Sequence, residues 1–138
     1  MIEINNLTTN SIDEKFLRKI TQKVLEGEGK GESDLSIALI GPGRMRKLNK
    51  RYLGKNRATD VLAFGESQIP KTLLGLGEIV ICPREVKKNA KRFSEGFGKE
   101  LATCLIHGIL HLLGYDHEKN EKEAEKMEAK QKTYLNQL

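Results

Sequence analysis

The stretch KELATCLIHGILHLLGYDH, residues 99–117, decides how this chain folds. Apolar residues occupy nearly every side of a helix drawn over residues 99–113, which predicts a central helix buried on most of its surface. Gly114 tolerates the left-handed backbone that ends a helix. The apolar runs are shorter than the ~18 residues that a membrane span needs, so we expect no membrane partner.

All three histidines of the chain lie in this stretch, at His107, His111 and His117. Residues four apart stand on one helix face, one turn above the other, so the first two can offer imidazoles to a single ion. After Gly114 the chain can turn back and present His117. Three nitrogen ligands leave one tetrahedral position for water, as in catalytic zinc sites. The spacing predicts one Zn²⁺ per chain, held by three histidines and water.

The flanking sequence predicts strands and helices around this central helix. Alternating or continuous apolar runs indicate strands near residues 1–6, 35–40, 59–64 and 76–82, with a loop over 65–75. Helical spacing indicates helices near 12–24, 44–53, 83–93 and from Glu118 to the end. We therefore predict the α+β class. The expected architecture is one domain over residues 1–138, with a small, mostly four-stranded sheet packed against helices and a zincin-like platform on the central helix.

Composition narrows the class of protein further. Hydrophobic residues make up 38% and charged residues 31% of the 138 residues, which excludes a disordered chain and a membrane bundle. Cys82 and Cys104 are far apart and lie among apolar neighbours, so we expect reduced core thiols and no disulfide partner. Together with an N-terminus that lacks a signal-peptide pattern, this favours a cytoplasmic protein.

Positive charge is concentrated in the middle of the chain. Residues 41–99 carry fourteen Lys and Arg against five Asp and Glu, whereas the whole chain has a net charge of +5. Residues 44–57 hold seven of these cations and no acidic side chain. Such a block favours a polyanionic partner whose phosphates the cations would hold.

The histidine spacing matches the metzincin peptidases except at one position. Their signature H-E-x-x-H-x-x-G-x-x-H shares the three histidines and the glycine, but Gly108 replaces the glutamate. In the peptidases that glutamate is the general base. A zincin-like peptidase or amidohydrolase is therefore an alternative that lacks its main chemical group.

The block HGILHLLGYDH is very similar to the signature of the YbeY-type endoribonucleases, bacterial rRNA maturation factors. Residues 49–52 (NKRY), 59–64 (TDVLAF) and 76–82 (LGEIVIC) resemble the other blocks of that family, in the same order, and the resemblance covers about residues 35–135. It implies a metal-dependent endonuclease that hydrolyses single-stranded RNA, acts in 16S rRNA 3′-end maturation and ribosome quality control, and works with rRNA and a ribosomal subunit. It also implies zinc on His107, His111 and His117.

One position departs from the family pattern and leaves the catalytic residues open. Family members commonly carry an arginine after the tyrosine that corresponds to Tyr52, and here that position is Leu53. Arg51, Lys55 or Arg57 are the candidates to bind substrate in its place. Asp116, beside the last histidine, is the candidate general base or outer partner of a ligand. A non-catalytic, zinc-containing RNA-binding protein of ribosome assembly is the further alternative.

Overall fold

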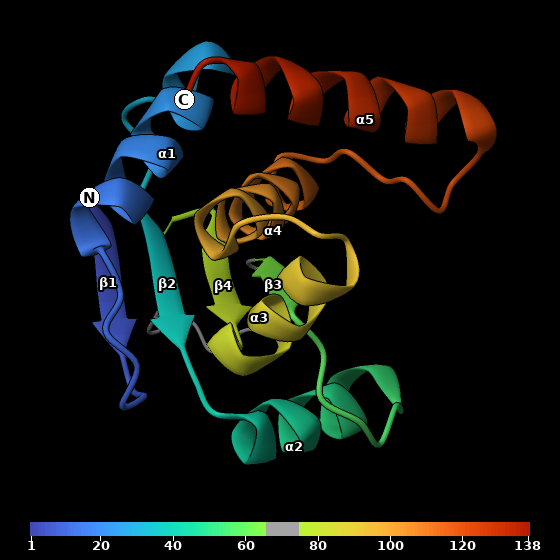
Figure 1. The fold of residues 1–138 in the computed structure, drawn as a ribbon. Helices are drawn as coiled ribbons and strands as arrows, with labels where there is room; N and C mark the ends of the chain where they lie inside the picture. The colour runs from blue at the N-terminus through green and yellow to red at the C-terminus, as the bar shows by residue number, and fades with distance from the viewer. Residues whose placement is uncertain (66–74) are drawn as a thin grey trace.

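The computed structural model describes residues 1–65 and 75–138, and it contains a four-stranded mixed sheet (Figure 1). The strands are β1 (Ile2–Asn6), β2 (Leu35–Leu39), β3 (Val61–Gly65) and β4 (Gly77–Ile81), in the spatial order β1-β2-β4-β3. β1, β2 and β4 run parallel, and β3 pairs antiparallel with β4 at the edge. Most of the loop expected over 65–75 lies outside the described residues.

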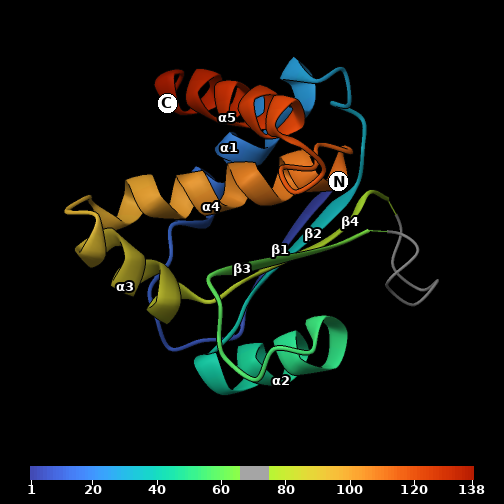
Figure 2. The same cartoon turned by 90° about the vertical axis from the view of Figure 1, so that its right-hand side faces the viewer.

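The helices of residues 1–65 and 75–138 cover the two faces of this sheet (Figure 2). They are α1 (Glu14–Gly27), α2 (Pro42–Leu53), α3 (Pro83–Arg92), α4 (Phe97–Leu112) and α5 (Glu121–Asn136). α1 and α4 pack on one face, α5 lies over them on the outside, and α2 lies alone on the other face. The arrangement confirms the α+β class, with the histidine-bearing helix at its centre.

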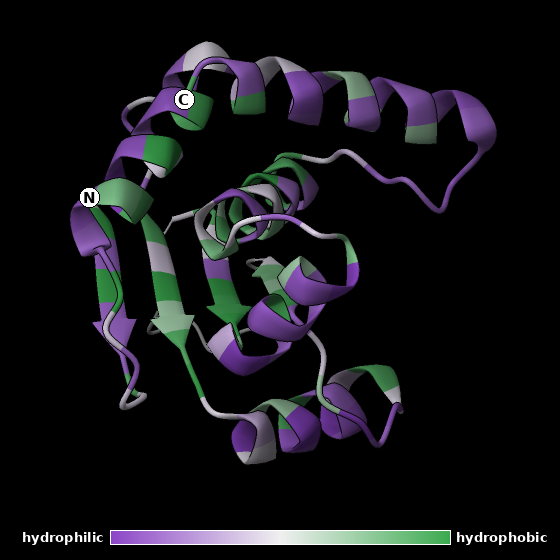
Figure 3. Cartoon of the chain, viewed as in Figure 1, coloured by the Kyte–Doolittle hydropathy of each residue, from purple (hydrophilic) through white to green (hydrophobic). Residues whose placement is uncertain are grey.

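The core has two parts because the central strand β4 is covered on both faces. Ile79 and Ile81 point into the larger core beneath α1 and α4, whereas Val80 and Cys82 point into a smaller core against α2. A strand buried on both faces has no polar side, which explains its continuous apolar sequence. α4 is correspondingly the most hydrophobic helix, while α5 is hydrophilic over most of its surface (Figure 3).

Four of the helices in the described residues begin at residues other than those predicted. α1 starts at Glu14 and α2 at Pro42, each two residues from the predicted starts at 12 and 44. α4 starts at Phe97, two residues before the predicted start at 99, and Gly96 is its N-cap. α5 starts at Glu121 and not at Glu118, because Asn120 caps it: the side-chain oxygen of Asn120 accepts a hydrogen bond of 2.8 Å from the backbone N–H of Glu123. Residues 118–120 therefore stay in the turn that follows His117.

Both cysteines are buried and unpaired, as predicted for core thiols. Among the helices built from residues 1–65 and 75–138, none combines the length and the apolar content that a bilayer crossing requires.

Candidate metal centre

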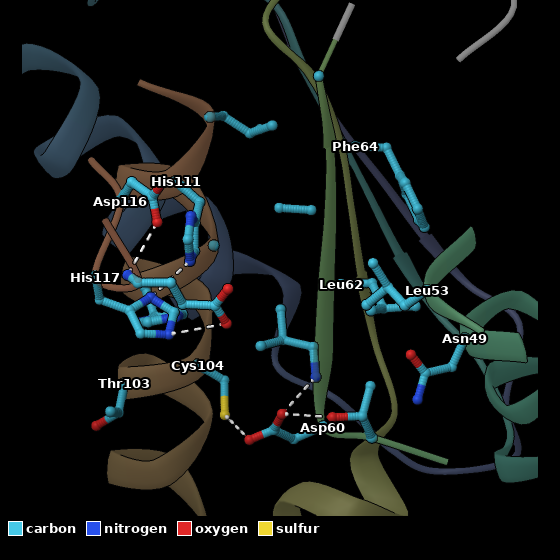
Figure 4. Close-up of a pocket in the computed structure, with 18 of the residues that line it drawn as sticks. Asn49, Leu53, Asp60, Leu62, Phe64, Thr103, Cys104, His111, Asp116 and His117 are labelled. Carbon is cyan, nitrogen blue, oxygen red and sulfur yellow. Dashed lines mark hydrogen bonds and ion pairs between the residues drawn. The ribbon is translucent and has the colours of Figure 1, made fainter. Parts of the chain in front are cut away.

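A groove of about 730 Å³ runs between α4 and the edge strand β3 (Figure 4). α4 contributes one wall, including His107 and His111. β3 and the C-terminal end of α2 contribute the facing wall, including Leu53 and Phe64. The turn that carries His117 closes one end.

The three histidine rings converge at that end of the groove. Their ring centroids are 4.8 to 5.0 Å apart in every pairing. His111 Nε2 lies 3.1 Å from His117 Nδ1, and one nitrogen from each of the three rings lies within 4.8 Å of the others. A metal ion with bonds of about 2.0–2.1 Å to imidazole nitrogen needs three nitrogens gathered in this way.

The local sequence explains how the third ring reaches the first two. α4 ends with Leu113 as its C-cap, and Gly114 adopts a φ of +103°, a backbone conformation that favours glycine. The N–H of Tyr115 then donates to the carbonyl of Leu110 at 3.1 Å. This closing turn reverses the chain and returns His117 to the helix face that carries the other two histidines.

A partly buried carboxylate fixes this turn to the rest of the protein. The Tyr115 hydroxyl donates to Glu28 Oε1 at 2.6 Å, and the Tyr134 hydroxyl donates to the other oxygen of Glu28. Lys130 Nζ lies 3.3 Å from the same carboxylate. Glu28 thus joins the end of α1 to helix α5 and to the turn after α4. The turn residue that it holds, Tyr115, lies two residues before His117.

Gln131 of α5 forms a hydrogen bond with the His107 ring. Its Oε1 lies 2.5 Å from His107 Nδ1. The amide oxygen can only accept, so Nδ1 carries the proton and Nε2 keeps its lone pair for a metal. This is the outer hydrogen bond that metal-binding histidines normally make.

The electrostatics keep two of the three imidazoles in the neutral form that binds metal. Burial lowers the pKa of His107 below its ordinary value. Burial also lowers the pKa of His111, and the neighbouring His107 and His117 lower it further. A neutral imidazole keeps a nitrogen lone pair that a divalent cation can bind. The donor set therefore fits a metal with borderline preference such as zinc.

The structure places the predicted substrate-binding residues at different locations. Lys55 and Arg57 line the groove. Arg51 lies outside it, with its guanidinium 5.5 Å from the centroid of the Tyr52 ring. Leu53 is 54% exposed and lines the groove.

Asp116 is exposed at the rim of the groove, near enough to His111 to act on its pKa. One of its carboxylate oxygens accepts a hydrogen bond of 2.9 Å from the N–H of Glu118. The carboxylate of Glu118 itself lies 3.8 Å from His117 Nε2. Two acidic side chains therefore flank the third histidine.

Gly108 occupies the position of the metzincin glutamate and lies against the sheet. A Cβ atom at this position would come within 3.2 Å of Ile79 Cγ2 and 3.4 Å of Val61 Cγ2. A glutamate side chain there would displace core side chains of β3 and β4. The metzincin general base is thus absent from the sequence and poorly accommodated by the packing.

Sequence reasoning missed four residues of this groove: Gln131, Asp60, Glu100 and Cys104. Glu100 and Cys104 precede His107 by seven and three residues on α4, and this helical spacing could have placed them on the histidine face. Asp60 directly precedes β3. Gln131 gave no signal, because it reaches His107 only through the packing of α5 on α4.

Comparisons with known proteins agree on one family. The family model of Endoribonuclease YbeY matches residues 3–138. A relative from Petrotoga mobilis named Endoribonuclease YbeY is 38% identical over 136 residues, covering 98% of this chain and 92% of the relative. One of the same name from Thermodesulfovibrio yellowstonii is 44% identical over 106 residues, covering 75% of this chain and 66% of the relative. The solution structure of TM1509 from Thermotoga maritima is similar with a TM-score of 0.68 at 35% identity, covering 98% of this chain and 87% of that one.

Proposed function

The chain belongs to the Endoribonuclease YbeY family, and we propose that it cleaves single-stranded RNA at the groove between α4 and β3. The observation that carries the proposal is the convergence of His107, His111 and His117 at one end of a groove that is also lined by Lys55 and Arg57. We further propose that residues 1–138 act as a single endoribonuclease domain.

We assign the three histidines the binding of one Zn²⁺, with water as the remaining ligand. When bound, the ion supplies positive charge to the phosphoryl oxygens of the scissile bond. Gln131 holds His107 in the tautomer that leaves Nε2 for the metal. The turn fixed by Glu28 and Tyr115 keeps the third imidazole beside the other two.

The remaining roles fall to charged side chains at the groove. Lys55 and Arg57 bind the phosphates on either side of the scissile bond and set its position. Arg51 supports binding from outside the groove, where it also lies over the Tyr52 ring. Asp116, exposed beside His111, accepts the proton of the attacking group as general base.

The cellular role that we propose is the maturation of the 16S rRNA 3′ end and the quality control of ribosomes in the cytoplasm, with a ribosomal subunit as partner. It is supported by the family membership and by the excess of positive charge in residues 41–99. The tight packing around Gly108 makes the peptidase alternative the weaker one.

Cleavage assays on matched RNAs test the proposal. The His111→Ala variant should lose one equivalent of zinc and at least about 100-fold in the rate on a single-stranded oligoribonucleotide, because the charge that stabilises the transition state is lost. The control Lys88→Ala removes an exposed cation of α3, outside the residues that line the groove, and should keep both properties. A duplex of the same sequence should be cut poorly by every variant. Wild-type cleavage by metal-free His111→Ala protein would overturn the proposal.

A further inference from the structure

Two carboxylates and one thiol converge in the groove, next to the histidine cluster. They are Asp60 at the start of β3 and Glu100 and Cys104 on α4. Cys104 Sγ lies 3.5 Å from Asp60 Oδ2 and 3.9 Å from Glu100 Oε1, and one ligand atom from each residue lies within 4.8 Å of the others. Figure 4 shows the Asp60 carboxylate and the Cys104 thiol facing each other across the groove.

These separations match those of ligands around a tetrahedral ion. Zinc binds sulfur at about 2.3 Å and carboxylate oxygen at about 2.0–2.2 Å, so a sulfur and an oxygen on one ion lie about 3.6 Å apart. The two measured sulfur–oxygen separations bracket this value. Only small side-chain shifts would be needed to bring all three donors to one ion.

The Glu100 carboxylate is buried without a cation beside it in the part of the chain that the structure describes. Glu100 is 7% exposed, and its carboxylate contacts the Cys104 thiol at 3.9 Å and the carboxyl group of Glu95. No lysine or arginine of residues 1–65 and 75–138 forms an ion pair with Glu100 or Asp60. Burial raises the pKa of Glu100, and the nearby Glu95 and Asp60 raise it further. Glu95 is itself paired with Lys99 at 3.0 Å. A buried carboxylate beside other carboxylates is costly unless a cation or a proton neutralises it.

Asp60 is held in place from outside the cluster. The N–H of Val61 donates to Asp60 Oδ1 at 2.8 Å, and Asn89 Nδ2 of α3 donates to Oδ2 at 3.1 Å. These bonds fix the carboxylate so that Oδ2 faces the thiol. Outer hydrogen bonds of this kind orient the carboxylate ligands of metal sites.

We propose that Asp60, Glu100 and Cys104 form a second cation site, for a divalent ion that accepts both sulfur and oxygen, such as Zn²⁺, Co²⁺ or Cd²⁺. On binding, the Cys104 thiol releases its proton to solvent and the thiolate becomes the ligand. The charge of the ion then compensates the carboxylates that the fold buries at this place.

This ion would be separate from the one on the histidines. Glu100, Cys104, His107 and His111 form one stripe on α4, and a rise of 1.5 Å per residue puts the centres of the two donor groups about 10 Å apart along the helix. Two metal ions that act together on one phosphodiester bond lie about 3.5–4 Å apart, so these two ions would not form such a pair. The role that we assign rests on the proposed function: the second ion neutralises acidic side chains along a groove through which RNA phosphates pass.

Cobalt titration of the metal-free, reduced chain tests the second site directly. Because the histidine site contains no sulfur, a sulfur-to-cobalt charge-transfer band in the near ultraviolet reports the second site alone. We expect two Co²⁺ per wild-type chain and such a band. His111→Ala should lose one equivalent and keep the band. Cys104→Ser should lose the band, and Glu100→Gln, which keeps size and shape, should weaken the binding that produces it by at least about tenfold.

Cys82→Ala is the matched control, since Cys82 is equally buried but lies in the smaller core against α2. It should keep the band. The proposal is overturned if the wild type binds one Co²⁺ without the band, if the band survives Cys104→Ser in folded protein, or if Glu100→Gln binds as the wild type does. RNA cleavage is assayed separately: a chain with the band but without cleavage contradicts the proposed function and leaves the second site supported.

Discussion

Replacing Gln131 by alanine should weaken zinc binding although the residue touches no metal. The change removes the acceptor that lies 2.5 Å from His107 Nδ1 and leaves the half-buried N–H of that ring without a partner. An unsatisfied buried donor costs about 1–3 kcal/mol. Loss of an outer hydrogen bond to a metal ligand lowers metal affinity by about 10–100-fold. Since a factor of 100 corresponds to about 2.7 kcal/mol, the two ranges agree.

Competition with a chromophoric chelator measures this loss. The titration is made in a Cys104→Ser background, so that zinc on the histidines alone is counted. Gln131→Glu keeps the acceptor and adds charge to it, and it should bind zinc at least as tightly as the parent. Lys132→Ala changes the next residue, which is paired with Glu128 at the surface, and should have no effect. A zinc affinity for Gln131→Ala within twofold of the parent would refute the assigned tautomer of His107 and the outer role of Gln131.

Three further predictions concern the turn, the sheet-facing glycine and the groove. Burial alone would raise the pKa of Glu28, but hydrogen bonds from Tyr115, Tyr134 and Lys130 bring it below its ordinary value, so Glu28→Gln should cost about 1–3 kcal/mol in urea unfolding at neutral pH. A carboxyl group whose pKa is lower in the folded than in the unfolded state stabilises the fold at pH values above its unfolded-state pKa. The difference in unfolding free energy between Glu28→Gln and wild type should therefore shrink as pH falls through the folded-state pKa of Glu28. A difference that stays constant with pH would contradict this. Gly108→Glu should lower stability by about 1–3 kcal/mol, because its side chain meets Ile79, and should yield no peptidase activity on a peptide panel. Leu53→Arg should bind single-stranded RNA more tightly, with a slope of log affinity against log salt steeper by about 0.7, whereas Leu7→Arg, at a site of equal exposure outside the groove, should not.

The fold and the histidine cluster were predictable because they depend on local spacing. Two histidines one helical turn apart share a face whatever surrounds the helix, and Gly114 permits the turn that returns the third. The apolar runs predicted the strands of the sheet. They did not specify the order of these strands in the sheet, which is β1-β2-β4-β3. That order matters, because it puts β3 at the edge, where its residues line the groove.

The outer parts of the site depend on packing between distant segments. Gln131 lies 24 residues after His107, on a helix that is polar over most of its surface, so no pattern distinguishes it from its neighbours. Cys104 was predicted as a core thiol and is buried, but it also faces two carboxylates. Arg51 carries the same charge as Lys55 and Arg57, and only the course of α2 shows that it lies outside the groove.

X-ray absorption of the protein loaded with one equivalent of zinc tests most directly whether three imidazoles hold one ion. We expect three imidazole nitrogens at about 2.0–2.1 Å in the wild type, and no three-imidazole coordination in His111→Ala protein, whose histidine site no longer holds the ion. A first coordination sphere with one imidazole or none, or a spectrum that His111→Ala leaves unchanged, would contradict the account.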